Sequence, residues 1–94
     1  MPFNIPRARL LKGSATIDFG SILAGVTSEM TITVTGALVG DACEIGAPAG
    51  IEQNLDIFGY VSATDTVTIR LRNLNAITAI DPASATWTAW VMRG

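Results

Sequence analysis

Histidine is missing from this 94-residue sequence, and cysteine occurs once, at Cys43. Without histidine, neither a Ser-His-Asp nor a Cys-His catalytic arrangement can be built, and the commonest general base of enzymes is absent. A single cysteine also excludes an internal disulfide and, with no histidine, the usual zinc clusters. We therefore expect no enzyme activity, no cofactor and no metal site, and we interpret Cys43 as a small hydrophobic residue in a buried position.

Other signatures of chemistry are equally sparse. The glycine-containing segments lack the lysine and the strand-to-helix context of a phosphate-binding loop. Four acidic side chains could in principle meet as a carboxylate pair or a calcium site, but their spacing gives no support for either. These are Asp18, Asp41, Glu44 and Asp56. We interpret them as solvated surface acids and expect no small-molecule substrate.

Charge is scarce and uneven. Only 15% of the residues are charged, against about 25% in a typical soluble protein, while 49% are hydrophobic. A chain of this length buries only about two-thirds of its unfolded surface, so its own core is limited. These features favour a subunit whose surface is partly covered by others, although singly exposed apolar residues are an ordinary alternative. The net charge of −2 opposes nucleic-acid binding.

The first 13 residues differ from the rest. Pro2 and Pro6 fix the backbone and remove two donors, which predicts an extended N-terminal arm over residues 1–13. No basic residue follows until Arg70, so a basic arm precedes an acidic body. The arm either docks on a partner or is a solvated, disordered terminus. The candidate docking residues are Phe3, Ile5, Arg7, Arg9 and Lys12.

Long hydrophobic runs are also missing. The start lacks the apolar core of a signal peptide, and no run approaches the roughly 20 residues of a membrane helix. We expect a protein that is made in the cytoplasm and has no membrane partner. Later release in a particle is compatible with this expectation.

The clearest pattern in the chain is a hairpin over residues 60–73. Val67, Ile69 and Leu71 alternate with polar residues, which is the period-2 signature of a half-buried strand. Similar alternation predicts strands over residues 15–22, 28–35, 42–45, 55–61 and 86–92, with a short one over 77–80. The sequence thus predicts an all-β fold, a small β-sandwich or jelly roll of six to eight short antiparallel strands, forming one domain over residues 14–94.

Two of the predicted strands carry large apolar side chains on both faces. Phe58 and Tyr60 lie opposite the core-facing residues of their strand, and Trp90 with Met92 lies opposite Trp87. Two tryptophans on opposite faces cannot share one small core, so Trp90 is a candidate interface anchor. Phe58 and Tyr60 are either a subunit contact or ordinary surface aromatics. Arg70 and Arg72 are either a solvated face or an inter-subunit salt-bridge row.

Four segments carry a resemblance to a known family. They are GSATIDFGSILAG, TITVTGALVGDA, YVSATDTVTIRLRN and AIDPASATWTAWV, which together cover most of residues 13–92. They resemble a β domain that recurs in structural proteins of tailed bacteriophages, both as small capsid decoration (cement) proteins and as an appendage of larger phage proteins. The resemblance implies a jelly-roll-like β-sandwich, often trimeric, that clamps neighbouring capsomers on the outer capsid surface. It assigns no individual binding residues.

From this resemblance we expect a structural virion protein that forms a homotrimer, binds the major capsid protein and stabilises the assembled shell. Trimer formation is expected to bury the second faces described above, while the arm reaches the capsid protein. The alternative is a receptor- or glycan-binding β module of a tail fibre or baseplate. Exposed aromatic residues in loops would favour that alternative, whereas here most aromatic residues fall within predicted strands.

Overall fold

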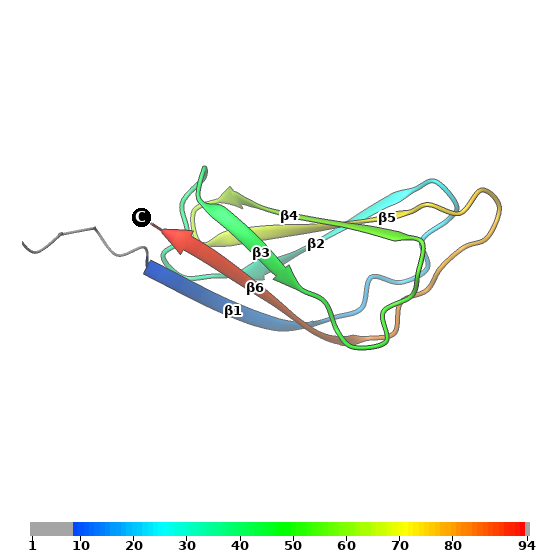
Figure 1. Cartoon of the computed structure of the whole chain (residues 1–94), viewed down its shortest axis with the longest axis horizontal. Helices are drawn as coiled ribbons and strands as arrows, with labels where there is room; N and C mark the ends of the chain where they lie inside the picture. The colour runs from blue at the N-terminus through cyan, green and yellow to red at the C-terminus, as the bar shows by residue number, and fades with distance from the viewer. Residues whose placement is uncertain (1–8, 94) are drawn as a thin grey trace, which may run out of the picture.

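The computed structural model describes residues 9–93, which form six antiparallel strands and, within that range, no helix (Figure 1). The strands are β1 (Arg9–Ile17), β2 (Thr27–Thr33), β3 (Ala42–Gly46), β4 (Leu55–Ala63), β5 (Thr66–Asn73) and β6 (Ala85–Arg93). The all-β prediction is confirmed. So is the hairpin, because β4 and β5 pair directly around a turn at Thr64 and Asp65.

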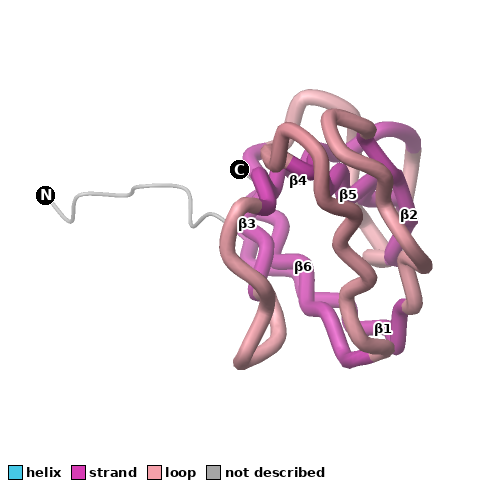
Figure 2. Tube along the Cα trace, turned by 90° about the vertical axis from the view of Figure 1, so that its right-hand side faces the viewer, coloured by secondary structure: helices cyan, strands magenta, loops and turns pink. Residues whose placement is uncertain are grey.

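The strands are divided between two three-stranded sheets. One sheet has the order β1-β6-β3 and the other β2-β5-β4, and Figure 2 shows them as two layers. Only the β4–β5 hairpin connects strands of the same sheet; every other connection between the six strands crosses between the layers. The pairing is nested, since the first strand pairs with the last and the second with the fifth.

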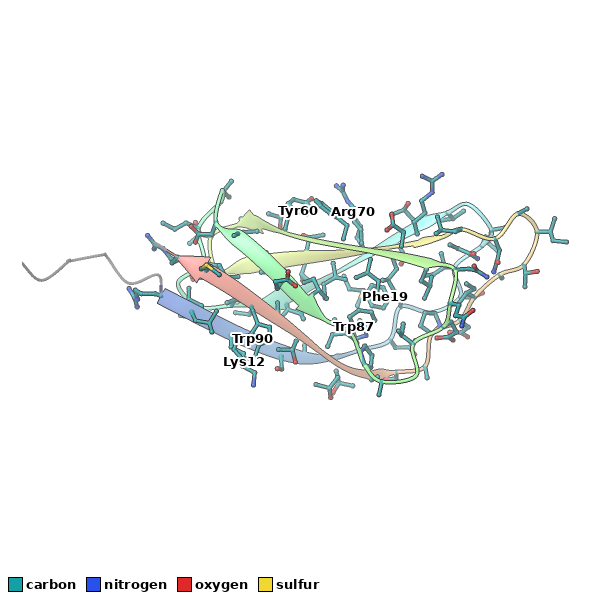
Figure 3. The ribbon with its side chains drawn as sticks, in the orientation of Figure 1. Lys12, Phe19, Tyr60, Arg70, Trp87 and Trp90 are labelled. Carbon is teal, nitrogen blue, oxygen red and sulfur yellow. The ribbon has the colours of Figure 1, made fainter. Side chains whose placement is uncertain are left out.

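The core lies between the two sheets and follows the predicted alternation. Val67, Ile69 and Leu71 of β5 are fully buried, and so are Trp87, Ala89 and Val91 of β6. Burial of each valine, isoleucine or leucine side chain among them contributes about 1.5–3 kcal/mol to the stability of the fold. The Trp87 ring packs edge-on against Phe19, with 5.3 Å between ring centroids (Figure 3).

Two glycines allow the sheets to approach each other closely. A Cβ atom on Gly13 of β1 would overlap the carbonyl oxygen of Thr33 in β2 and lie 2.8 Å from Val34 Cγ2. On the other side of the molecule, a Cβ atom on Gly59 of β4 would overlap the Ile45 side chain of β3. At Gly13 the overlapping atom belongs to the backbone, so glycine is required there, whereas at Gly59 a Cβ atom would force the Ile45 side chain to move.

The first strand differs from its prediction. It spans Arg9–Ile17 rather than residues 15–22, so residues 9–13 of the expected arm belong to the sheet. No proline follows Pro6 in this region, and β6 supplies a backbone partner for every position from Arg9 to Ile17. After Ile17 the chain leaves the sheet at Gly20, whose φ is 69° and whose N–H donates to Asp18. The remainder of the predicted arm lies outside the described residues.

The short strand expected over residues 77–80 is reduced to one bridge. Ile80 exchanges backbone hydrogen bonds with Ile22, at 2.7 and 3.0 Å, in the loop that connects β1 to β2. Two loops from opposite ends of the chain are therefore joined side by side at one end of the molecule (Figure 1).

Candidate interaction surfaces

The outer face of the β2-β5-β4 sheet carries aromatic and charged side chains, and we call it the arginine face: Glu29, Phe58, Tyr60, Arg70 and Arg72. Strand register places these residues side by side, since Glu29 and Phe58 both lie opposite Arg70. The rings of Phe58 and Tyr60 stack, with 5.6 Å between centroids and an interplanar angle of 27°. The structure thus gathers all four residues that the sequence predicts on these strands.

Arg70 is the centre of this face (Figure 3). Its guanidinium carbon lies 4.9 Å from the centroid of the Tyr60 ring, and its Nη2 donates a 3.1 Å hydrogen bond to the Tyr60 hydroxyl. Its Nε donates to the Glu29 carboxylate. The hydrogen bond with Glu29 raises the pKa of Arg70 above its already high ordinary value, so the guanidinium stays cationic. The Glu29 carboxylate therefore balances the positive charge of Arg70 within the arginine face.

Arg72 lies at the edge of a shallow depression on the same face. The depression has a volume of about 220 Å³ and is lined by Thr27, Asp56, Phe58, Arg70 and Arg72. Phe58 is 53% exposed there. The exposed Phe58 ring can stack on an apolar surface, while the Arg72 and Asp56 side chains beside it can hydrogen-bond polar groups.

The outer face of the β1-β6-β3 sheet is more apolar, and we call it the tryptophan face: Leu10, Lys12, Trp90 and Met92. In the β1–β6 register Lys12 lies opposite Trp90, with its Nζ 4.9 Å from the ring centroid (Figure 3). Leu10 lies opposite Met92, and these side chains are 62% and 53% exposed. A depression of about 210 Å³ is lined by Leu10, Ala42, Cys43, Glu44, Trp90 and Met92.

Cys43 lies at the inner side of this depression and is half-buried. Burial raises the pKa of its thiol, and the neighbouring Glu44 carboxylate raises it further. Since the thiolate is the reactive form, a raised pKa leaves Cys43 protonated and unreactive near neutral pH. This agrees with its interpretation as a small hydrophobic residue, although it is less buried than expected.

The structure divides the predicted site residues between two opposite faces of the molecule (Figure 3). Phe58, Tyr60, Arg70 and Arg72 lie together on the arginine face, and Trp90 and Met92 lie on the tryptophan face. The basic residues Arg9 and Lys12 belong to β1, with Arg9 opposite Arg93 in register. Phe3, Ile5 and Arg7 lie outside the described residues.

Sequence reasoning missed a buried polar residue, Asn73, at the end of β5. Its amide nitrogen donates to the carbonyl oxygens of Ile22 and Thr78, at 2.9 and 2.8 Å, and its side-chain oxygen accepts a 2.9 Å bond from the Asn75 backbone. Asparagine in a segment rich in turn-forming residues signals a turn, and nothing in the sequence indicates that this side chain is buried. Asn73 holds the two loops that contain Ile22 and Thr78 together.

The aliphatic residues of the same two loops were also missed. Leu23 and Val26 lie in the loop between β1 and β2, and Leu74 and Ile77 lie between β5 and β6. All four are exposed. Leu23, Val26 and Leu74 fall between predicted strands, where large aliphatic residues are the available signal, and Ile77 was predicted as the start of the short strand over residues 77–80.

Within residues 9–93, no three metal-ligating side chains come together. None of these residues forms a helix long and apolar enough to cross a membrane. Comparisons with protein-family models, with curated proteins and with solved structures find no match to this chain.

Proposed function

We propose that this chain is a structural virion protein that binds the outer surface of a phage capsid as a homotrimer and stabilises the assembled shell. The observation that carries the proposal is the exposure of large apolar side chains on both outer sheet faces, in a chain with few charges. Phe58 and Met92 are each 53% exposed and Leu10 is 62% exposed. The four sequence segments that resemble phage decoration domains add to this support.

We also propose that the two sheets form a jelly roll. A jelly roll is built from two sheets with Greek-key connections. Nested pairing of β1 with β6 and of β2 with β5, together with repeated crossing between the layers, favours that description here. The expected arm is proposed for the residues that precede β1.

The proposed mechanism is thermodynamic. A protein that binds the assembled shell, and not its dispersed subunits, stabilises the shell by mass action, and many identical sites act together. The tryptophan face and the arginine face are the candidate contact surfaces, with aromatic residues of the kind that dominate interface energetics. Host cytoplasm is the proposed place of synthesis, and the outer capsid surface is the proposed final location.

A second candidate function has a specific observation in its favour. The depression beside Phe58 combines an exposed ring with Asp56 and Arg72, the kind of apolar platform and polar rim that can accept a sugar. A receptor- or glycan-binding module of a tail fibre or baseplate would use such a site.

Cosedimentation of the purified protein with empty, tailless capsids tests the proposal. We expect saturable binding, with a copy number proportional to the major capsid protein. Light scattering should show a species three times the 9.8 kDa chain mass. Absence from the capsid pellet, with a few copies found in isolated tails, would favour the glycan-binding alternative. A 9.8 kDa species at all concentrations would exclude the trimer.

A further inference from the structure

Two loops expose large aliphatic side chains at one end of the molecule. We call this surface the loop platform: Leu23, Val26, Leu74 and Ile77. Ile77 is 91% exposed and Leu23 is 63% exposed. Figure 1 shows the two loops side by side at the end farther from the C-terminus.

The loops of the platform are joined by specific bonds. Asn73 bonds both of them, and the Ile22–Ile80 bridge links them directly. The backbone of Asn73 also exchanges hydrogen bonds with Gly25 and Val26, at 2.9 and 3.1 Å. Exposed aliphatic side chains on loops that are joined in this way lose little further backbone entropy when a partner covers them.

Acidic residues predominate in the segments at the platform end of the molecule (Figure 1). Four exposed acids lie at this end of the molecule, against one exposed basic residue, Arg72. The acids are Asp18, Glu52, Asp56 and Asp81. A partner for this surface should therefore present apolar side chains together with positive charge.

We propose that the loop platform binds the N-terminal segment of a second copy of this chain. That segment supplies the required chemistry, because Phe3 and Ile5 are apolar and the basic residue Arg7 lies two positions after Ile5. The proposal assigns Phe3 and Ile5 to a contact between subunits, instead of the capsid contact expected from the sequence. It concerns the protein in solution and does not depend on capsid binding.

Chain geometry excludes the same contact within one copy. β1 begins at Arg9 and runs toward the platform. Its nine residues span about 26 Å from the first Cα atom to the last, at about 3.3 Å for each step between neighbouring residues. The segment from Phe3 to Arg9, fully extended, covers at most about 21 Å. To reach its own platform, this segment would also have to reverse direction at Arg9. An N-terminal segment can therefore reach the platform only of another copy.

Such a contact is heterologous, because the N-terminal segment of one subunit binds the loop platform of the next, which is a different part of the chain. Heterologous contacts produce closed rings when the rotation between subunits closes, and a trimer is one such ring. Each subunit of a ring contributes one segment and one platform, so every apolar segment and every platform is covered.

The test compares two double variants of the full chain by sedimentation velocity over a range of concentrations. Leu74→Ser with Ile77→Ser removes half of the platform, and Phe3→Ser with Ile5→Ser removes the apolar part of the segment. Each double variant should weaken self-association about a hundredfold, since each lost aliphatic contact accounts for roughly tenfold. Leu38→Ser with Val39→Ser is the matched control, because these exposed residues lie at the opposite end, and it should associate like the wild type.

Mixing the two defective variants gives the decisive result. The platform variant keeps an intact segment, and the segment variant keeps an intact platform, so an equimolar mixture should form a one-to-one dimer although neither variant associates alone. Circular dichroism should show that each variant keeps the β fold. A monomeric wild type, a platform variant that associates normally, or a mixture that stays monomeric would each overturn the proposal.

Discussion

A polar side chain joins separate segments at each end of the molecule, Asn73 at the loop end and Asp65 at the hairpin end, but the two act in different ways. At the loop end, the side chain of Asn73 is completely buried and makes three hydrogen bonds to irregular backbone. At the opposite end, the hairpin turn holds the β2–β3 loop through Asp65, whose carboxylate accepts a 2.7 Å hydrogen bond from the Gly36 backbone. Asp65 is only half-buried, and it adopts a positive φ of 61°.

This difference follows from what each end has to connect. The turn at Asp65 joins two strands of one sheet, so the strand ladder already fixes most of its backbone. The loops at Asn73 cross between sheets and have only the Ile22–Ile80 bridge as regular pairing between them. An amide that both donates and accepts can replace the missing ladder bonds. The loop end therefore depends on its side chain more than the hairpin end does.

Replacing Asn73 by leucine should have the largest effect. The variant loses all three side-chain hydrogen bonds and leaves the Thr78 carbonyl and the Asn75 N–H without their partner. At about 1 kcal/mol for each lost bond, the free energy of unfolding should fall by about 3 kcal/mol. Thermal unfolding should show a Tm lower by roughly 15 °C.

Asn75→Ala is the matched control for this variant, because Asn75 takes part through its backbone nitrogen and keeps that bond. Its Tm should stay within a few degrees of the wild type. Equal stability of Asn73→Leu and Asn75→Ala would show that the buried amide is not what fastens the loop end.

Changes at Asp65 should have intermediate effects that separate backbone strain from hydrogen bonding. Asp65→Asn keeps an acceptor and tolerates positive φ, so its stability should match that of the wild type. Asp65→Gly loses only the bond to Gly36, at about 1 kcal/mol. Asp65→Ala adds the cost of a positive φ and should lose about 2 kcal/mol. Chemical denaturation measures all three, and a greater loss for Asp65→Ala than for Asn73→Leu would reverse the ranking of the two ends.

Much of the fold could be predicted from the sequence because strand alternation is a local signal. Val67, Ile69 and Leu71 are buried as their spacing predicts, and Trp87 and Trp90 point to opposite faces. The start of β1 could not be predicted in this way. Residues 9–13 alternate weakly, and they are held in the sheet by pairing with β6, a partner more than 70 positions away in sequence.

The close approach at Gly13 could not be predicted either, because it also depends on a residue that is distant in sequence. A glycine at the end of a predicted arm reads as a flexible connection, and only the position of Thr33 shows that a side chain has no room there. Loop surfaces are harder still, because the grouping of Leu23 with Leu74 depends on how two loops cross between sheets. The sequence predicts which strand faces are apolar, but it does not predict the apolar surfaces that are formed by loops between strands.

The smallest expected effect is on self-association, when acidic residues at the loop end are neutralised. Asp18→Asn with Asp81→Asn removes two acids beside the platform, and self-association at low salt should weaken about threefold, as expected for exposed charges. Ala63→Lys with Thr64→Lys changes the net charge equally but acts at the hairpin end, where both residues are exposed, and it should leave association unchanged. At about 1 M salt the screening length falls to about 3 Å, so the two double variants should then behave alike. Equal weakening by both at low salt would mean that net charge, rather than the position of the acids at the loop end, governs association.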